Sequence, residues 1–254
     1  MLSAPKANSE VNGPDPRAAI GVVAPFDLEL DREMWRWLPE DVDIFITRTP
    51  FIHDEVTVEF AQAASDAPAI ARATRDVTAG PASTVAYACT SGSFVGGRAA
   101  EEAIVETMLA SGADRALTTS GALVEALGFL GVARVVVATP YIAQLSQKLS
   151  DFLAEHDITA VDNVSLGRST HISQVLYQET AQMIRAADRD DAEAIVISCT
   201  NLPTYDLLVP LERELGKPII SANQATLWAA LRRINREAVG EGQVLLTHLG
   251  AARR

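Results

Sequence analysis

The sequence predicts an α/β protein with parallel sheets, and two observations lead to this fold class. First, short β-branched apolar runs alternate with helical patterns from residue 18 to the end of the chain. Such alternation is typical of βαβ units, whose right-handed crossovers make neighbouring strands parallel. Second, the same short phrases recur in the same order in both halves of the chain. We therefore expect two similar α/β lobes with a functional site in the cleft between them.

Each predicted strand is a short apolar run that ends in a polar or turn-forming residue. In chain order these strands are Ala19–Pro25, Asp43–Thr49, Thr84–Cys89, Arg115–Thr119, Arg134–Thr139, Thr159–Val164, Ala194–Cys199, Pro218–Ala222 and Gln243–His248. The segments between them have apolar residues at helical spacing. The predicted helices include Leu28–Leu38, Val56–Val77, Gly97–Ala110, Ile142–His156, Ser173–Ala187 and Ala225–Glu237.

The internal duplication sets the expected domain boundaries. The repeated phrases are Gly21–Phe26 with Val135–Tyr141, Val85–Ser91 with Ile195–Asn201, and Thr119–Leu123 with Ala222–Thr226. We expect a first lobe over residues 18–130 plus 226–254 and a second lobe over 131–225. Residues 1–17 are polar and rich in Pro, Gly and Asn, which predicts a disordered N-terminal extension.

The composition is that of an ordinary soluble globular protein, with 48% hydrophobic and 21% charged residues. The net charge of −12 and the absence of a basic run argue against nucleic acid and anionic membranes as partners. No apolar segment is long enough to predict a spanning helix or a signal peptide. Two cysteines in 254 residues do not make a disulfide framework, so a reducing cytoplasm is the expected location.

The two cysteines, Cys89 and Cys199, are the most informative residues, because each follows a predicted strand and precedes a turn into a helical pattern. Open α/β sheets bind ligands beyond the carboxyl ends of their strands. Two thiols brought there by two similar lobes would face each other across one small molecule. Helix N-termini lower thiol pKa values, which favours a catalytic role over the alternative of two small buried apolar side chains. No ligand-spaced His or Asp cluster accompanies them, so we expect no metal.

Polar residues follow both thiols. Thr90 and Ser91 follow Cys89, and Thr200 and Asn201 follow Cys199. Backbone N–H groups, hydroxyls and amides at such turns can hold a carboxylate or an enediolate, although the same residues also serve as ordinary helix caps. The glycines after Cys89 form neither a dinucleotide fingerprint nor a Walker motif, so we expect no nucleotide cofactor.

Four further residues at strand or helix ends are candidates for contact with a substrate. Tyr141 follows a strand and would point its phenol into the cleft, whereas its counterpart in the first lobe is an apolar Phe. Pro25 ends the first strand, and Asp27 is the nearest polar side chain to it. His171 stands at the start of a predicted helix, where it could bind a carboxylate or move protons, or merely cap the helix.

These landmarks resemble the aspartate/glutamate racemase superfamily, and within it the branch of maleate cis-trans isomerases and arylmalonate decarboxylases. The resemblance spans about residues 18–250, and its most specific pieces are Ala88–Gly92, Thr139–Tyr141, Ile197–Thr200 and Ser221–Ala225. It implies two pseudo-symmetric Rossmann-like (flavodoxin-like) lobes, no cofactor, and a homodimer or tetramer. It also implies that Cys89 and Cys199 form a catalytic pair, with Thr90, Ser91 and Tyr141 around a substrate carboxylate.

The expected activity is therefore isomerisation or racemisation of a small carboxylate or dicarboxylate through two opposed cysteines. One alternative is a decarboxylase in which Cys199 alone donates a proton, since the resemblance implies glycine at the first cysteine position of such enzymes. Another is a non-catalytic small-molecule binding protein. The chain departs from the maleate isomerase pattern at Pro25–Leu28, where the resemblance implies Pro-Ser-x-Asn, and at His171, where it implies a second asparagine. The reaction type is thus better specified than the substrate.

Overall fold

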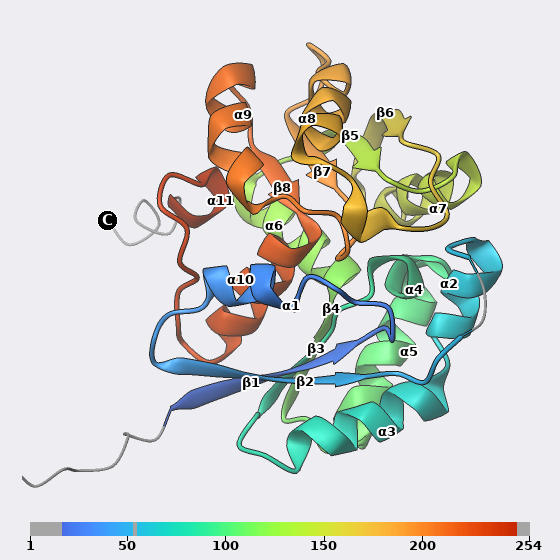
Figure 1. Ribbon diagram of the computed structural model, residues 1–254, viewed down its shortest axis with the longest axis vertical. Coiled ribbons are helices and arrows are strands. Elements are labelled where there is room, and N and C mark those ends of the chain that lie inside the picture. The colour runs from blue at the N-terminus through green and yellow to red at the C-terminus, as the bar shows by residue number, and fades with distance from the viewer. Residues whose placement is uncertain (1–16, 53–54, 248–254) are drawn as a thin grey trace, which may run out of the picture.

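The computed structural model describes residues 17–52 and 55–247, and it contains two four-stranded parallel sheets (Figure 1). The strand order is β2-β1-β3-β4 in the first sheet and β6-β5-β7-β8 in the second. The two orders are equivalent, so the second half of the chain repeats the topology of the first. This arrangement confirms the predicted α/β fold with two similar parallel sheets. The expected N-terminal extension falls almost wholly outside the described residues.

The strands agree closely with the apolar runs of the sequence. They are β1 (Ala18–Ala24), β2 (Val42–Arg48), β3 (Thr84–Tyr87), β4 (Arg115–Thr118), β5 (Arg134–Thr139), β6 (Thr159–Ser165), β7 (Ala194–Ile197) and β8 (Ile219–Ser221). The strands β3 and β7 are buried along their whole length, because helices cover both faces of a parallel sheet.

The helices fill the connections between successive strands. They are α1 (Asp31–Met34), α2 (Val58–Ala64), α3 (Ala67–Thr78), α4 (Thr90–Phe94), α5 (Gly97–Ala110), α6 (Thr119–Leu130), α7 (Ala143–Ala154), α8 (Tyr177–Ala186), α9 (Leu208–Leu215), α10 (Ala222–Arg233) and α11 (Val244–Thr247). Short 3₁₀ turns are η1 (Trp35–Trp37), η2 (Ile172–Gln174) and η3 (Tyr205–Leu207). None of the helices in the described part of the chain is long and apolar enough to cross a membrane.

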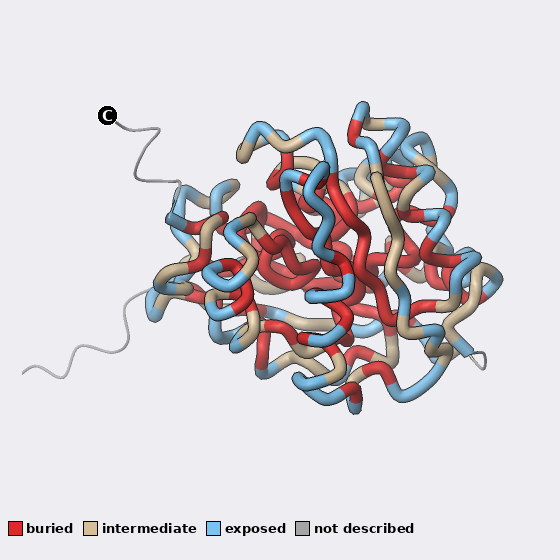
Figure 2. Tube along the Cα trace, turned by 90° about the horizontal axis from the view of Figure 1, so that it is seen from above, coloured by how far each residue is buried: buried red, intermediate tan, exposed pale blue. Residues whose placement is uncertain are grey.

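Helix α10 joins the two halves. Every residue from Ala222 to Leu231 is buried, as expected for a helix enclosed by other elements on all sides. It packs against α6, β3 and β4 as well as β8, and buried residues run continuously through the centre of the molecule (Figure 2). A capping box between Ser221 and Gln224 fixes its first turn. The division into lobes at residues 130/131 and 225/226 stays a prediction.

Two predicted elements were wrong. Residues 244–247 form helix α11 rather than a strand, because the backbone N–H of Val244 donates to the Glu212 carboxylate at 3.0 Å instead of to a sheet. The predicted end of that strand, His248, lies outside the described residues. The long helix predicted over Val56–Val77 is two helices, α2 and α3. They are separated at Asp66, whose carboxylate caps α3 by accepting from the N–H of Ala69 at 3.0 Å.

The helix predicted over Leu28–Leu38 is also shorter than expected. Only α1 and the turn η1 form there, and residues 25–30 run as a loop toward the second half of the chain. The cause lies in the tertiary contacts, since Asn201 hydrogen-bonds to the backbone of Asp27 and Glu29 and so holds this segment out of a helix. This loop brings Asp27 to the site described next.

Candidate active site

The carboxyl ends of β1, β3, β5 and β7 meet around a small chamber of about 20 Å³. Its lining residues are Pro25, Asp27, Val56, Phe60, Cys89, Thr90, Ser91, Tyr141, Ile172, Cys199, Thr200 and Asn201. Nine of the ten candidate residues from the sequence are therefore brought together, and both cysteines are among them. The tenth, His171, does not line this chamber. The space suffices for about one water molecule, so a substrate must widen it.

Direct hydrogen bonds hold the two cysteine turns against each other. The Thr200 hydroxyl donates to the carbonyl oxygen of Ala88 at 3.2 Å, and the Asn223 amide donates to the carbonyl oxygen of Thr200 at 3.0 Å. The Asn201 amide donates to the Asp27 carbonyl at 2.6 Å and accepts from the Glu29 N–H at 2.8 Å. The side chains of Thr200 and Asn201 are thus occupied in joining the two halves, and their predicted contact with substrate stays a prediction.

Cys89 stands at the N-cap of α4, two residues after β3 ends. Its Sγ lies 3.9 Å from the Ser91 hydroxyl. A Cβ on Gly92 would lie 3.1 Å from this sulfur and 2.5 Å from the Tyr87 hydroxyl oxygen, so only glycine fits here without a shift. The Tyr87 hydroxyl in turn donates to the Ala64 carbonyl at 2.7 Å. The sulfur, the phenol and the start of α4 therefore form one tight cluster.

Tyr87 is a site residue that the sequence analysis missed. The spacing along the sequence indicates its position. Residues two apart in an extended chain point to the same side, and Tyr87 stands two residues before Cys89. Tyr141 plays the equivalent part for Cys199, since a hydrogen bond links this phenol to that thiol. Each thiol in the chamber is therefore paired with a buried phenol.

Cys199 has an unusual backbone. Its φ of 107° lies in the region that L-residues rarely adopt, at a cost of roughly 1–3 kcal/mol. The N–H of Asn201 lies 3.4 Å from its Sγ. No α-helix begins directly after Cys199, because a turn over Thr200 and Asn201 follows and the next helical element is η3. The expected helix N-terminus at the second thiol was therefore wrong.

The thiol pKa values also differ from expectation. Burial raises the pKa of the Cys89 thiol and raises that of Cys199 to about 12. Hydrogen bonds from the Gly92 backbone to Cys89 and from Tyr141 to Cys199 act in the opposite direction but do not outweigh desolvation. The charge of Asp27 raises both thiol pKa values further, and burial raises the pKa of Asp27 itself. Near neutral pH both sulfurs therefore keep their protons.

The chamber also contains an unsatisfied hydroxyl. Thr90 Oγ1 is buried and has no hydrogen-bond partner among the described residues. Buried polar groups are almost always paired, so an orphan that lines a cavity is a ready contact for a ligand. Within the described part of the chain, the hydroxyl of neighbouring Ser91 has only its 3.9 Å contact with the Cys89 sulfur. These two hydroxyls are available to hold a substrate oxygen.

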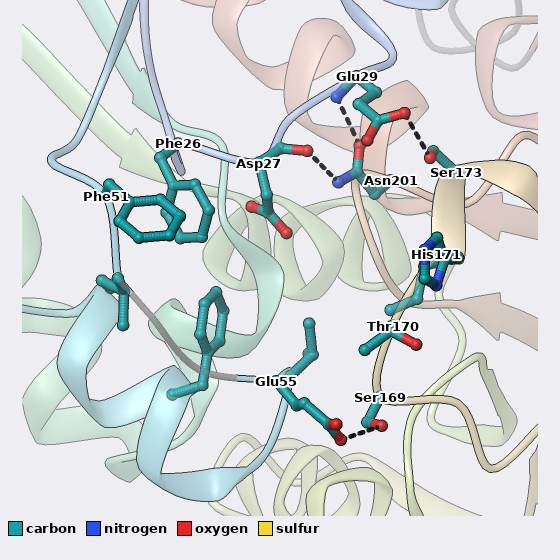
Figure 3. Close-up of a pocket in the computed structure, with 14 residues that line it drawn as sticks. Phe26, Asp27, Glu29, Phe51, Glu55, Ser169, Thr170, His171, Ser173 and Asn201 are labelled. Carbon is teal, nitrogen blue, oxygen red and sulfur yellow. Dashed lines mark hydrogen bonds between the residues drawn. The ribbon is translucent and has the colours of Figure 1, made fainter.

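A larger cavity of about 450 Å³ adjoins the chamber (Figure 3). Five residues line both spaces: Asp27, Val56, Phe60, Ile172 and Asn201. His171, with a φ of 52°, lines the outer cavity together with the segment over residues 169–173. The described residues contain no group of three metal-ligating side chains, and neither cavity offers one.

Comparisons with known proteins support the resemblance found in the sequence. A family model described as arylmalonate decarboxylase matches residues 58–246. A maleate isomerase of Nocardia farcinica is 32% identical over 171 residues, 63% of this chain and 68% of that protein. An arylmalonate decarboxylase of Bordetella bronchiseptica is 33% identical over 156 residues, 59% of this chain and 65% of that protein.

Solved structures agree with this relationship. A liganded mutant of arylmalonate decarboxylase matches with a TM-score of 0.82 at 27% identity, over 90% of this chain and 98% of that one. The match covers most of both chains, so the fold and the family model point to the same group of proteins. The chain belongs to the arylmalonate decarboxylase family, the branch of the aspartate/glutamate racemase superfamily in which its maleate isomerase relatives also stand.

Proposed function

We propose that this enzyme is a cofactor-independent cis-trans isomerase that acts on a small unsaturated carboxylate through Cys89 and Cys199. The observation that carries the proposal is that both thiols, one from each half of the chain, line a single small chamber. The chamber also holds the unpaired Thr90 hydroxyl. The maleate isomerase relatives suggest the reaction type. A thiol can add its sulfur to an alkene carbon and be expelled again, while the second thiol gives and takes the proton.

The substrate carboxylate next to the reacting carbon would bind at Thr90 and Ser91. Among the described residues, the Thr90 hydroxyl has no hydrogen-bond partner and the Ser91 hydroxyl has only its 3.9 Å contact with the Cys89 sulfur. Both residues stand in the first turn of α4. These donors are placed to stabilise the enediolate more strongly than the starting carboxylate, because its oxygens carry more negative charge. Tyr141, buried at the end of β5, would complete the group.

The reaction begins when the Cys89 sulfur bonds to one alkene carbon. The proton of that thiol passes to the carboxylate of Asp27, which lines the same chamber and whose pKa is raised by burial. The electron pair of the double bond moves into the enediolate, and Cys199 donates its proton to the second carbon. Rotation about the new single bond follows. Cys199 then takes a proton back and the carbon–sulfur bond breaks. Asp27 returns its proton to the Cys89 sulfur, and the trans product leaves.

The decarboxylase hypothesis is supported by the description of the matching family model and by the arylmalonate decarboxylases among the relatives and solved structures. Decarboxylation requires only one proton donor, which Cys199 could supply, and Cys89 would then have no function. Cys89 is instead buried and packed closely, and a Cβ added at Gly92 would lie only 3.1 Å from its sulfur. We therefore place isomerisation first. A Cys89→Gly variant that loses isomerisation but releases carbon dioxide from an arylmalonate would reverse this order.

The test is proton NMR in heavy water with maleate, aspartate, glutamate, hydantoins and arylmalonates. We expect the wild type to convert a cis-enoic acid to its trans isomer, and Cys89→Ser and Cys199→Ser to lose at least 10³-fold in kcat. Peptide mass spectrometry on Cys199→Ser should find substrate mass on Cys89. Gly128→Ala, at an open position in α6, serves as the control with full activity. Near-normal turnover by either cysteine variant contradicts the proposal.

We also propose a homodimer or tetramer in the cytoplasm, following the family resemblance and the cysteine usage. Sedimentation velocity on the purified chain would test the assembly, and a monomer at micromolar concentration would refute it. The substrate is a small molecule whether the enzyme is an isomerase or a decarboxylase, as for the related enzymes.

A further inference from the structure

Resting on the proposed isomerase chemistry, we infer that the outer cavity binds the far end of the substrate and selects a hydrogen-bond-donating, neutral or cationic group there. The preferred substrate class is then a monocarboxylate whose second end is an amide or an amine, rather than a dicarboxylate. Three features of the described residues lead to this inference: the sizes of the two spaces, the charges of the outer lining, and its aromatic wall.

The sizes show that a substrate cannot stay within the inner chamber. That chamber measures about 20 Å³ and the outer cavity about 450 Å³, and the two share five lining residues. A ligand whose carboxylate sits on Thr90 and Ser91 must extend past Asp27 into the outer cavity. The lining of this cavity therefore decides which second end is accepted.

The outer lining is rich in acceptors and poor in free donors. Asp27, Glu29 and Glu55 supply three carboxylates, and no Lys or Arg is present among its described lining residues. The hydroxyl of Ser169 donates to Glu55 at 2.6 Å, and that of Ser173 donates to Glu29 at 2.7 Å (Figure 3).

The remaining donors of this lining are few. The Asn201 amide already donates to the backbone carbonyl of Asp27. Thr170 and His171 are the only other polar side chains of the described lining. A second substrate carboxylate would meet three like charges and few donors, whereas an N–H group would meet acceptors.

The opposite wall is aromatic. The rings of Phe26 and Phe51 meet edge to face with centroids 4.9 Å apart (Figure 3). The ring centroids of Phe26 and Phe60 are 6.0 Å apart. An aromatic surface accepts an apolar chain, and it attracts a cation through the ring faces. Carboxylates on one side and rings on the other form a site for a substituent with an apolar body and an N–H or ammonium tip.

The experiment compares maleate, its half-amide maleamate, and N-(2-aminoethyl)maleamate, which share the carboxylate that is held at Thr90. We expect kcat/KM to rise in that order, with the cationic compound at least tenfold above maleate. In the double variant Glu29→Gln/Glu55→Gln this preference should fall at least tenfold. Glu59→Gln is the matched control, because Glu59 is an exposed carboxylate on α2 that does not line the cavity.

Binding of the saturated analogues separates this inference from the proposed function. Succinate, succinamate and N-(2-aminoethyl)succinamate, titrated by calorimetry, should bind with affinity rising in that order, whether or not any compound is isomerised. If cysteine variants abolish turnover but maleate and succinate are preferred, the inference is overturned and the isomerase proposal stands. If no alkene is isomerised, the isomerase proposal fails, and the calorimetric order alone decides the inference.

Discussion

Replacing Gly92 with alanine tests the tight cluster around Cys89. The added methyl would lie 2.5 Å from the Tyr87 hydroxyl oxygen, 3.4 Å from its Cε1 and 3.1 Å from the Cys89 sulfur. Carbon needs about 3.5 Å from such atoms, so the phenol must withdraw by roughly 1 Å. Tyr87 is fully buried and donates to the Ala64 carbonyl at 2.7 Å, so its withdrawal breaks that hydrogen bond.

The expected loss combines two terms. Overfilling a packed interior costs about 1–3 kcal/mol, and the broken buried hydrogen bond costs about 1 kcal/mol more. The free energy of unfolding should therefore fall by about 2–4 kcal/mol, which urea titration can measure. A shift of the Cys89 sulfur by about 1 Å should also lower kcat/KM for isomerisation by about 10²-fold. The two losses have one structural cause, so they should appear together.

Gly128→Ala provides the matched control, because no atom lies within 4 Å of the added methyl in helix α6. This variant should be unchanged or more stable by about 0.4–1 kcal/mol. In a Tyr87→Phe background, which lacks the clashing oxygen, Gly92→Ala should destabilise less than it does alone. If Gly92→Ala matches Gly128→Ala in stability and activity, the close packing at Cys89 does not govern the thiol and the reasoning is refuted.

Two further predictions concern protonation. Asp27→Asn removes a charge that raises the pKa of both thiols, so alkylation of Cys89 and Cys199 by iodoacetamide should begin at a lower pH than in the wild type. An unshifted alkylation profile would contradict the electrostatic role of Asp27. Burial raises the pKa of Glu212 from 4.5 to about 7, so the folded state binds this proton more tightly than the unfolded state. The stabilisation is complete below about pH 4.5 and falls by about 3 kcal/mol as the pH rises through 7. Urea unfolding at about pH 5 and pH 8 should show this decline in the wild type and not in Glu212→Gln; equal declines would show that another group causes it.

Local sequence patterns determined the sheets and much of the site composition. A strand such as β7 is a continuous apolar run because both of its faces are covered, and that signal needs no tertiary information. The ends of parallel strands meet at one edge, so residues placed there by the sequence, such as Cys89, Cys199 and Tyr141, were expected to share a cleft. They line one chamber. The family resemblance then predicted that the two thiols act as a catalytic pair.

The protonation of the thiols was decided by the tertiary structure. A short motif cannot show how much solvent remains around a side chain, and here desolvation raises thiol pKa values that the local pattern predicted to be low. The same limit applies to Asn201, a predicted substrate ligand whose amide binds the backbone of a loop 174 residues away in sequence. It applies also to α11, since a long-range hydrogen bond to Glu212 replaced the expected strand pairing.

The sequence by itself therefore determined the α/β architecture and the chemical groups delivered to the cleft, because both depend on spacing along the chain. The tertiary structure alone decided how closed the chamber is, which donors remain free, and that an acidic, aromatic cavity lies beyond it. These properties arise from contacts between segments far apart in the chain, and their strength depends on the exclusion of water.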